Sequence, residues 1–243
     1  MRIKINPGLF AKAAAFIADT NEIRHYLGGV HVEAATGHLG GVLIYASCGH
    51  MLFMAHDKDG VFERQPGEPA RQILMARPPM VAACRSAHRA NISRTDTAAQ
   101  RFVLFDGRRL SVALDFGCEA NDGEFYVHPG YAVIPGRNNG TAIDWQRVIC
   151  RWDDLLPGPS GVLNIAYISK AALAAGNGRH STPARMWHWQ KDGPTLVQMI
   201  DHPEICIAIM PMRVLDENVP WLGDGKLKPR AMVRAQEVVN RDA

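Results

Sequence analysis

The sequence predicts an α+β fold in which single helices pack on one side of antiparallel strands, and three observations support this prediction. Single helical segments alternate along the chain with runs of short, strand-like segments. This order begins again after Arg71 and once more, incompletely, near Ser169. Glycine-containing turns separate the strand-like segments. A repeated unit of this kind buries the apolar face of one helix against one sheet.

The first unit opens with a helix predicted over residues 7–19. Asn6 can act as its N-cap, and Pro7 fits the first helical position, where the missing N–H is not needed. Apolar residues then recur at a spacing of three to four: Leu9, Phe10, Ala13, Phe16 and Ile17. Strands are predicted over residues 26–34, 42–45 and 51–55, with turns at Thr36-Gly37 and at Leu39-Gly40-Gly41.

The second and third units repeat this order. The second has a strand over residues 73–75, a helix over 78–90, and strands over 101–105 and 110–115 around a turn at Asp106-Gly107. The third has a helix over 169–175, ended by Gly176, and strands over 186–190, 196–200 and 205–211.

Composition predicts a folded, soluble protein. The 243 residues are 47% hydrophobic, enough for a substantial core. Five cysteines without a CxxC pair favour reduced thiols and a cytoplasmic location. Neither a signal peptide nor an apolar run of about 18 residues is present, so we expect no secretion and no membrane contact. The net charge of +3 is too small to indicate nucleic-acid binding by itself.

Two short stretches carry the functional signal, YASCGHMLF at residues 45–53 and IAIMPMRV at residues 207–214. The first resembles the part of the bacterial sliding clamp, the DNA polymerase III beta subunit, that reads Thr-Asp-Gly-His-Arg-Leu after an apolar run. The second resembles that family's C-terminal Val-Met-Pro-Met-Arg-Leu strand. Residues 21–32, 71–85 and 122–135 resemble further clamp segments in the family's order. The resemblance implies a DNA-clamp-like fold whose helices line a central hole and whose sheets face outward.

The same resemblance implies a domain layout. Residues 1–135 correspond to the family's middle domain, and residues 136–214 to an incomplete C-terminal domain that carries the pocket strand. No stretch resembles the first domain. Residues 215–243 extend past the end of the family's pattern, and we expect them to form a basic, flexible tail.

In the clamp family the two stretches form the walls of a peptide-binding pocket, and their chemistry suits that role. Methionine-rich apolar surfaces adapt to several partners, a glycine permits close backbone approach, and a histidine and an arginine can orient a peptide at the rim. The candidate pocket residues are Ser47, Gly49, His50, Met51, Leu52, Ala76, Met80, Ile209, Met210, Pro211, Met212, Arg213 and Val214. From composition alone these residues equally fit an ordinary strand core.

Several pocket positions depart from the family's pattern. Ser47-Cys48 stands where clamps have Thr-Asp, Met51 where they have arginine, and Ala76 where they have proline. We expect these changes to keep the pocket apolar, to alter its rim and to shift its preference among partners.

Basic residues on the predicted helices form the candidate DNA-binding set: Lys12, Arg77, Arg85, Arg89 and Lys170. A ring contacts phosphates without reading bases, so the expected partner is duplex DNA of any sequence. The alternative for any one of these clusters is a solvated face that keeps the protein soluble.

No catalytic or cofactor site is predicted. Cys48 and His50 lack a third group to orient them, and Cys84 with His88, one helical turn apart, supply only two metal ligands. Motifs for nucleotide, dinucleotide or zinc-protease sites are absent from the sequence.

The sequence therefore favours a non-enzymatic, clamp-like accessory protein of DNA replication or repair. We expect it to tether a DNA polymerase, or another protein with a clamp-binding motif, to duplex DNA, and to act as a homo-oligomer. A truncated, divergent copy also fits a mobile element such as a prophage. Two alternatives remain open: an adaptor or decoy that binds such peptides without encircling DNA, and a small Cys/His metal-dependent enzyme.

Overall fold

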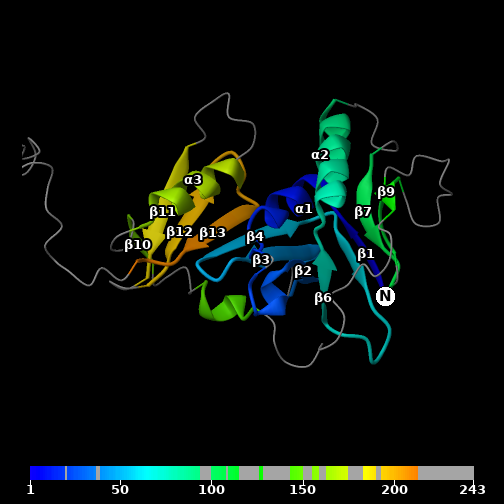
Figure 1. Cartoon of the computed structure of the whole chain (residues 1–243), viewed down its shortest axis with the longest axis horizontal. Coiled ribbons are helices and arrows are strands. Elements are labelled where there is room, and N and C mark those ends of the chain that lie inside the picture. Colours follow the sequence, from blue (N-terminus) through cyan, green and yellow to red (C-terminus); the bar gives the residue numbers. More distant parts are fainter. Residues whose placement is uncertain are drawn as a thin grey trace, which may run out of the picture. The chain divides into compact units, whose positions relative to one another are not determined.

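The computed structural model describes residues 1–19, 21–36, 39–93, 100–107, 109–114, 126–127, 143–149, 155–158, 163–174, 183–189 and 193–212. All of them belong to one compact unit, Met1–Met212. This part of the chain contains three α-helices and two sheets whose strands pair antiparallel (Figure 1). The predicted α+β class is therefore confirmed.

The larger sheet has eight strands in the order β10-β11-β12-β13-β4-β3-β2-β6. Its strands are β2 (Gly29–Ala34), β3 (Val42–Ser47), β4 (Met51–Asp57), β6 (Arg71–Met75), β10 (Leu156–Pro157), β11 (Ala184–His188), β12 (Thr195–Met199) and β13 (Ile205–Ile209). The pairing of β13 with β4 joins the third repeat to the first, with Ile205 opposite Ala55 and Ile209 opposite Met51.

The smaller sheet has the order β5-β1-β7-β8-β9. Its strands are β1 (Arg2–Ile5), β5 (Val61–Glu63), β7 (Phe102–Phe105), β8 (Leu110–Ala113) and β9 (Tyr126–Val127). Sequence patterns predicted β7 and β8 but missed β1, β5 and β9. Strands β5 and β9 have three and two residues, too few to show a period of two.

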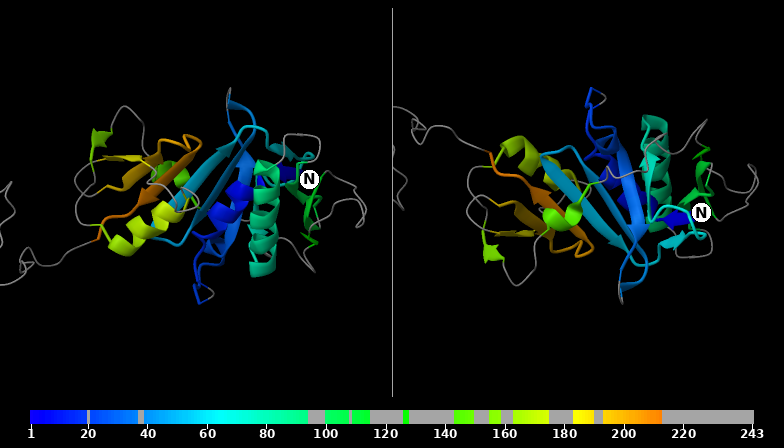
Figure 2. Two further views of the ribbon diagram at one scale, coloured as in Figure 1. Left: turned by 90° about the horizontal axis from the view of Figure 1, so that it is seen from above. Right: turned by 90° about the horizontal axis from the view of Figure 1, so that it is seen from below.

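The three helices, α1 (Pro7–Ala14), α2 (Pro78–Ile92) and α3 (Ile165–Ala174), lie on the same side of the large sheet. Seen from above they stand in front of its strands, and seen from below the strands come first (Figure 2). This is the one-sided arrangement that the sequence predicted.

Local hydrogen bonds set the helix ends. The Asn6 side chain accepts from the backbone N–H groups of Gly8 and Leu9, as an N-cap does. Helix α1 ends at Ala14, before the predicted residue 19, because the Phe16 N–H bonds to the Ala13 carbonyl and tightens the last turn. Helix α3 begins four residues earlier than predicted, where the Asn164 side chain accepts from the Ala166 N–H.

Both faces of the central strands are buried. Side chains alternate along a strand, so β4 directs Met51 and Phe53 into the core under the helices and Leu52 and Met54 into a second apolar cluster on the other face. Trp145, in the short 3-10 helix η4 (Trp145–Arg147), packs on this second cluster.

A buried polar anchor holds the η4 segment. The Trp145 indole N–H donates to Glu33 Oε1 at 2.8 Å, and the Tyr45 hydroxyl donates to Glu33 Oε2 at 3.0 Å. Burial raises the pKa of Tyr45, and the neighbouring Glu33 carboxylate raises it further, so the hydroxyl stays a donor.

None of the described helices is long and apolar enough to cross a membrane. The predicted residues 215–243 and most of residues 122–135 lie outside the described part of the chain, as does Gly176.

Where helices α1 and α2 meet, Gly8 of α1 lies so close to the His88 ring of α2 that there is no room for a side chain at residue 8. A Cβ at Gly8 would lie 2.6 Å from Cε1 and 2.7 Å from Cγ of the His88 ring. We predict that Gly8→Ala lowers the free energy of unfolding by about 1–3 kcal/mol, the usual cost of overpacking a core. Urea unfolding measures this loss.

The matched test repeats the change in a His88→Ala background. With the ring gone, Gly8→Ala should be neutral or stabilise by up to about 1 kcal/mol, since alanine is the better helix former. An equal loss in both backgrounds would show that the His88 contact is not what excludes a side chain at Gly8.

Candidate functional site

The sheet places the two stretches identified in the sequence side by side. The first residues of β4 pair with the last residues of β13, with Met51 opposite Ile209 and Leu52 opposite Ala208. Just beyond the paired positions, the Met210 N–H donates to the His50 carbonyl at 2.9 Å. The candidate pocket residues on these stretches thus converge at one end of this strand pair.

Only some of these residues are accessible. Met51 and Ile209 are 1% and 0% exposed and belong to the core under the helices. Leu52 is 3% exposed and belongs to the cluster on the opposite face. Met210 and Met212, in contrast, are 41% and 49% exposed.

Gly49 and His50 are also exposed, and Pro211 is half-buried. The accessible part of the candidate site is therefore the strand ends themselves. Arg213 and Val214 lie outside the described residues.

Ala76 and Met80 are the two candidates for this site that do not come from the two stretches. They follow β6, which lies at the other edge of the large sheet, with β4, β3 and β2 between it and β13. Neighbouring strands are about 4.8 Å apart, so β6 is roughly 19 Å from β13. Met80 is in addition fully buried in the core under the helices. Strand order results from long-range pairing, which local patterns do not reveal.

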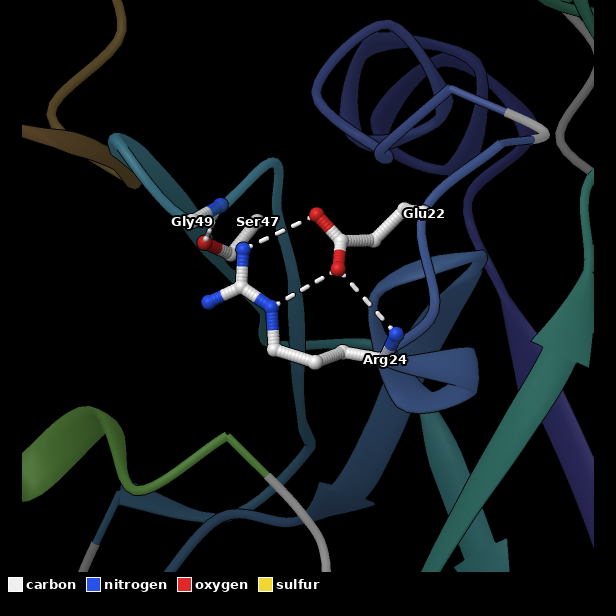
Figure 3. A network of polar contacts seen from close by, with 4 residues as sticks. All are labelled: Glu22, Arg24, Ser47 and Gly49. Carbon is white, nitrogen blue, oxygen red and sulfur yellow. Dashed lines mark hydrogen bonds and ion pairs between the residues drawn. The ribbon is translucent and has the colours of Figure 1, made fainter.

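An arginine that sequence reasoning missed covers Gly49 (Figure 3). Gly49 has a φ of 88°, and its N–H donates to the Ser47 hydroxyl at 2.9 Å. A Cβ at Gly49 would lie 2.7 Å from a terminal nitrogen of Arg24. Only glycine allows both this backbone conformation and this approach of the guanidinium.

Glu22 holds Arg24 in that position. Both oxygens of the Glu22 carboxylate accept from the guanidinium at 2.9 Å, and one also accepts from the Arg24 backbone N–H at 3.1 Å. These hydrogen bonds lower the pKa of Glu22 to about 2, so the pair stays charged over the physiological range. The glycine was noticed in the sequence, but nothing there connected it with Arg24.

The His50 ring stacks on a helix. Tyr167, in the first turn of α3, lies with its ring centroid 5.8 Å from that of His50 and an interplanar angle of 15°. One face of the exposed His50 ring is therefore occupied by Tyr167. Sequence reasoning gave no reason to pair these residues, because α3 was predicted to begin after Tyr167.

The candidate DNA-binding residues differ in their surroundings. Arg77, Arg85 and Arg89 are exposed, and Arg85 and Arg89 lie one turn apart on α2. Lys12 on α1 and Lys170 on α3 are half-buried. The ammonium group of Lys170 lies 5.7 Å from the centroid of the Phe16 ring. The three arginines are thus the members of this set that offer an open cationic surface.

The metal-site alternative finds no support in the described residues. Cys84 is fully buried in the core, and burial raises the pKa of its thiol, whereas a metal ligand must be a thiolate. Within the described ranges no three His, Cys, Asp or Glu side chains lie close enough together to hold a metal ion.

Solved structures with similar architecture are sliding clamps. The DNA polymerase sliding clamp from Caulobacter crescentus matches with a TM-score of 0.52 and 16% identity, over 88% of this chain and 65% of that one. The sliding clamp from Bartonella birtlesii, DNA polymerase III subunit beta bound to griselimycin, matches with a TM-score of 0.58 and 15% identity, over 88% and 66%. The DNA polymerase III subunit beta from Pseudomonas aeruginosa gives 0.54 and 14%, over 88% and 67%.

No family model and no curated protein matches the sequence. The chain spans about two thirds of the length of the clamps it resembles, 65% in the Caulobacter case. At such low identity the likeness establishes architecture, and it agrees with the resemblance of the two short stretches. The chain has the fold of the DNA polymerase III beta sliding clamps, in a divergent form.

Proposed function

We propose that this protein is a sliding-clamp-like accessory protein that binds duplex DNA of any sequence and presents a docking surface to peptides of polymerase-type partners. The observation that carries the proposal is the pairing of β4 with β13 in a clamp fold, which brings the two clamp-like stretches to one strand end. The role is non-enzymatic tethering. The cytoplasm, where replication proteins work in bacteria, is the expected location.

Exposed apolar and cationic side chains at that strand end are suited to binding a peptide. Met210 and Met212 offer flexible apolar surface, and the Arg24 guanidinium, paired with Glu22, lies over Gly49 at the neighbouring strand end. Burying two or three apolar side chains of a peptide is worth roughly 1.5–3 kcal/mol each before ordering costs, so we expect modest affinity.

Binding of a short peptide tests the docking surface. A peptide with the Gln-Leu-x-Leu-Phe type of motif should bind in the micromolar range, and Met212→Asp should weaken it at least tenfold by placing a charge in the apolar contact. Fluorescence anisotropy of the labelled peptide measures both.

The matched control is Ile200→Asp. Ile200 is 47% exposed, nearly the same as Met212, but lies in the turn before β13, at the opposite end of that strand. It should leave peptide affinity unchanged. If the unmodified protein does not bind the peptide, or if Met212→Asp and Ile200→Asp weaken binding equally, the strand end is not a docking surface.

DNA contact is assigned to the exposed arginines of α2. The double variant Arg85→Glu/Arg89→Glu should weaken duplex binding about equally for all sequences and reduce the dependence of affinity on salt, because fewer phosphate contacts release fewer counterions. Binding is measured on two unrelated duplexes at several salt concentrations.

The control variant Arg64→Glu/Arg147→Glu makes the same change in net charge at two other exposed arginines. It should retain the salt dependence of the unmodified protein. If both double variants behave alike, the effect reflects total charge, and α2 does not face DNA.

A ring requires self-association, because a chain of about two thirds of a clamp's length cannot encircle a duplex alone. We propose a homo-oligomer, since closed cyclic symmetry is the usual solution for a ring. Native mass spectrometry at micromolar concentration, with and without duplex DNA, should show a discrete oligomer. A strictly monomeric mass in both conditions would exclude the ring and leave the adaptor or decoy that binds peptides without encircling DNA.

A further inference from the structure

A second site lies at the other end of the same strand pair. A cavity of about 460 Å³ opens between the first turns of α1, the end of β4 with its following turn, α2, and the turn between β12 and β13. The backbone bond from the His56 N–H to the Glu204 carbonyl, 2.9 Å, closes that end of the pair. Each residue of a strand advances about 3.3 Å, so His56 is roughly 20 Å from His50.

Lys12 from α1, His88 from α2 and His202 from the β12–β13 turn all line this cavity, so basic side chains of three different elements reach it. Lys12 is half-buried, and among the described residues no carboxylate lies within ion-pair distance of its ammonium group. Burial lowers the pKa of Lys12, partly offset by the more distant Glu204 carboxylate. A desolvated cation without an ion pair is costly, and an anion in the cavity would offset that cost.

An anion in the cavity would also stabilise the charged form of His88. Burial, then the charges of Lys12 and His202, lower its pKa. Protonated His88 is therefore disfavoured in the empty cavity. An anion placed between Lys12 and His202 would favour it.

Two of the carboxylates around the cavity, those of Asp57 and Glu204, already have hydrogen-bond partners. Asp57 Oδ2 accepts from the Asn6 N–H at 2.6 Å, and burial raises the pKa of this carboxyl. Glu204 Oε1 lies 3.1 Å from His202 Nδ1.

Lys58, Asp59 and the ring of His56 complete the charged and titratable lining. With its three histidines neutral the cavity has more carboxylates than ammonium groups, and with them protonated the balance is positive. Its affinity for an anion must therefore rise as the pH falls through the histidine range.

We propose that this cavity binds a tetrahedral oxyanion, a phosphoryl group in the cell, held by Lys12, His88 and His202. The group could belong to a small phosphorylated molecule, or to the DNA backbone, in which case the inference rests on the proposed DNA binding. Binding takes up protons, because the anion stabilises the imidazolium form of His88, whose pKa is lowered in the empty cavity.

Sulfate is a suitable probe because its charge is constant between pH 6 and pH 8. It is titrated into the full-length protein at constant ionic strength, balanced with chloride, while the ring C–H resonances of His88 and His202 are followed by NMR. We expect saturable shifts of both rings, with affinity at least tenfold higher at pH 6 than at pH 8. Absence of a saturable shift at both pH values would overturn the proposal.

Two substitutions move the affinity in opposite directions. Lys12→Gln should abolish the sulfate response, whereas Asp59→Asn should strengthen it by removing a repelling charge, a gain that a misfolded variant cannot produce. The control Lys4→Gln changes a lysine of β1 that lies over the Phe102 ring, away from the cavity lining, and should have no effect. Equal losses in Lys12→Gln and Lys4→Gln would contradict the site.

A duplex oligonucleotide distinguishes the two sources of the phosphoryl group. If the DNA backbone occupies the cavity, duplex displaces sulfate from His88 and Lys12→Gln weakens duplex binding as well. If a small phosphorylated molecule is the occupant, sulfate binding is lost in Lys12→Gln with duplex binding retained. Both results support the site. Arg85→Glu/Arg89→Glu should keep its sulfate response even if it loses DNA, so failure of the DNA proposal and failure of this one are separable.

Discussion

The pairing of β13 with β4 is the interaction on which the rest of the structure depends. It joins two segments that lie about 150 residues apart in the sequence, and its five paired positions run from Ala55 with Ile205 to Met51 with Ile209. The alternation of side chains between the two apolar clusters specifies this register, because a slip by one residue would exchange the faces on which Met51 and Leu52 lie. The proposed docking surface at one end and the proposed oxyanion cavity at the other thus depend on one register.

Burial on both faces of the sheet limits what the strand pair can offer a partner. Met51 and Ile209 stabilise the core under the helices, and Leu52 stabilises the cluster that Trp145 covers. Each fully buried side chain of this size contributes roughly 1.5–3 kcal/mol, so selection for stability alone accounts for their apolar character. In the proposed docking role, recognition would then fall to groups at the strand ends, chiefly Met210, Met212 and Arg24.

The sequence predicted what depends on local patterns and missed what depends on long-range pairing. Asn6 and Pro7 correctly predicted where α1 begins, because helix capping depends on residues that are adjacent in the sequence. Asn164 could have given the start of α3 by the same logic, but its cap was overlooked. Neither Arg24 over Gly49 nor the group of Lys12, His88 and His202 was anticipated. Both omissions concern residues that only the strand order and the helix packing bring together.

The structure also changes how the departures from the clamp pattern should be understood. Met51, which stands where the family has arginine, lies in the core, so in this chain the position contributes packing and no charged group. The Ser47 hydroxyl accepts from the Gly49 N–H, a turn-forming bond that threonine can make equally well. Of the altered positions, only Cys48 is both half-buried and next to the exposed strand end. Among the described residues that depart from the clamp pattern, Cys48 is therefore the position from which a different partner preference would come.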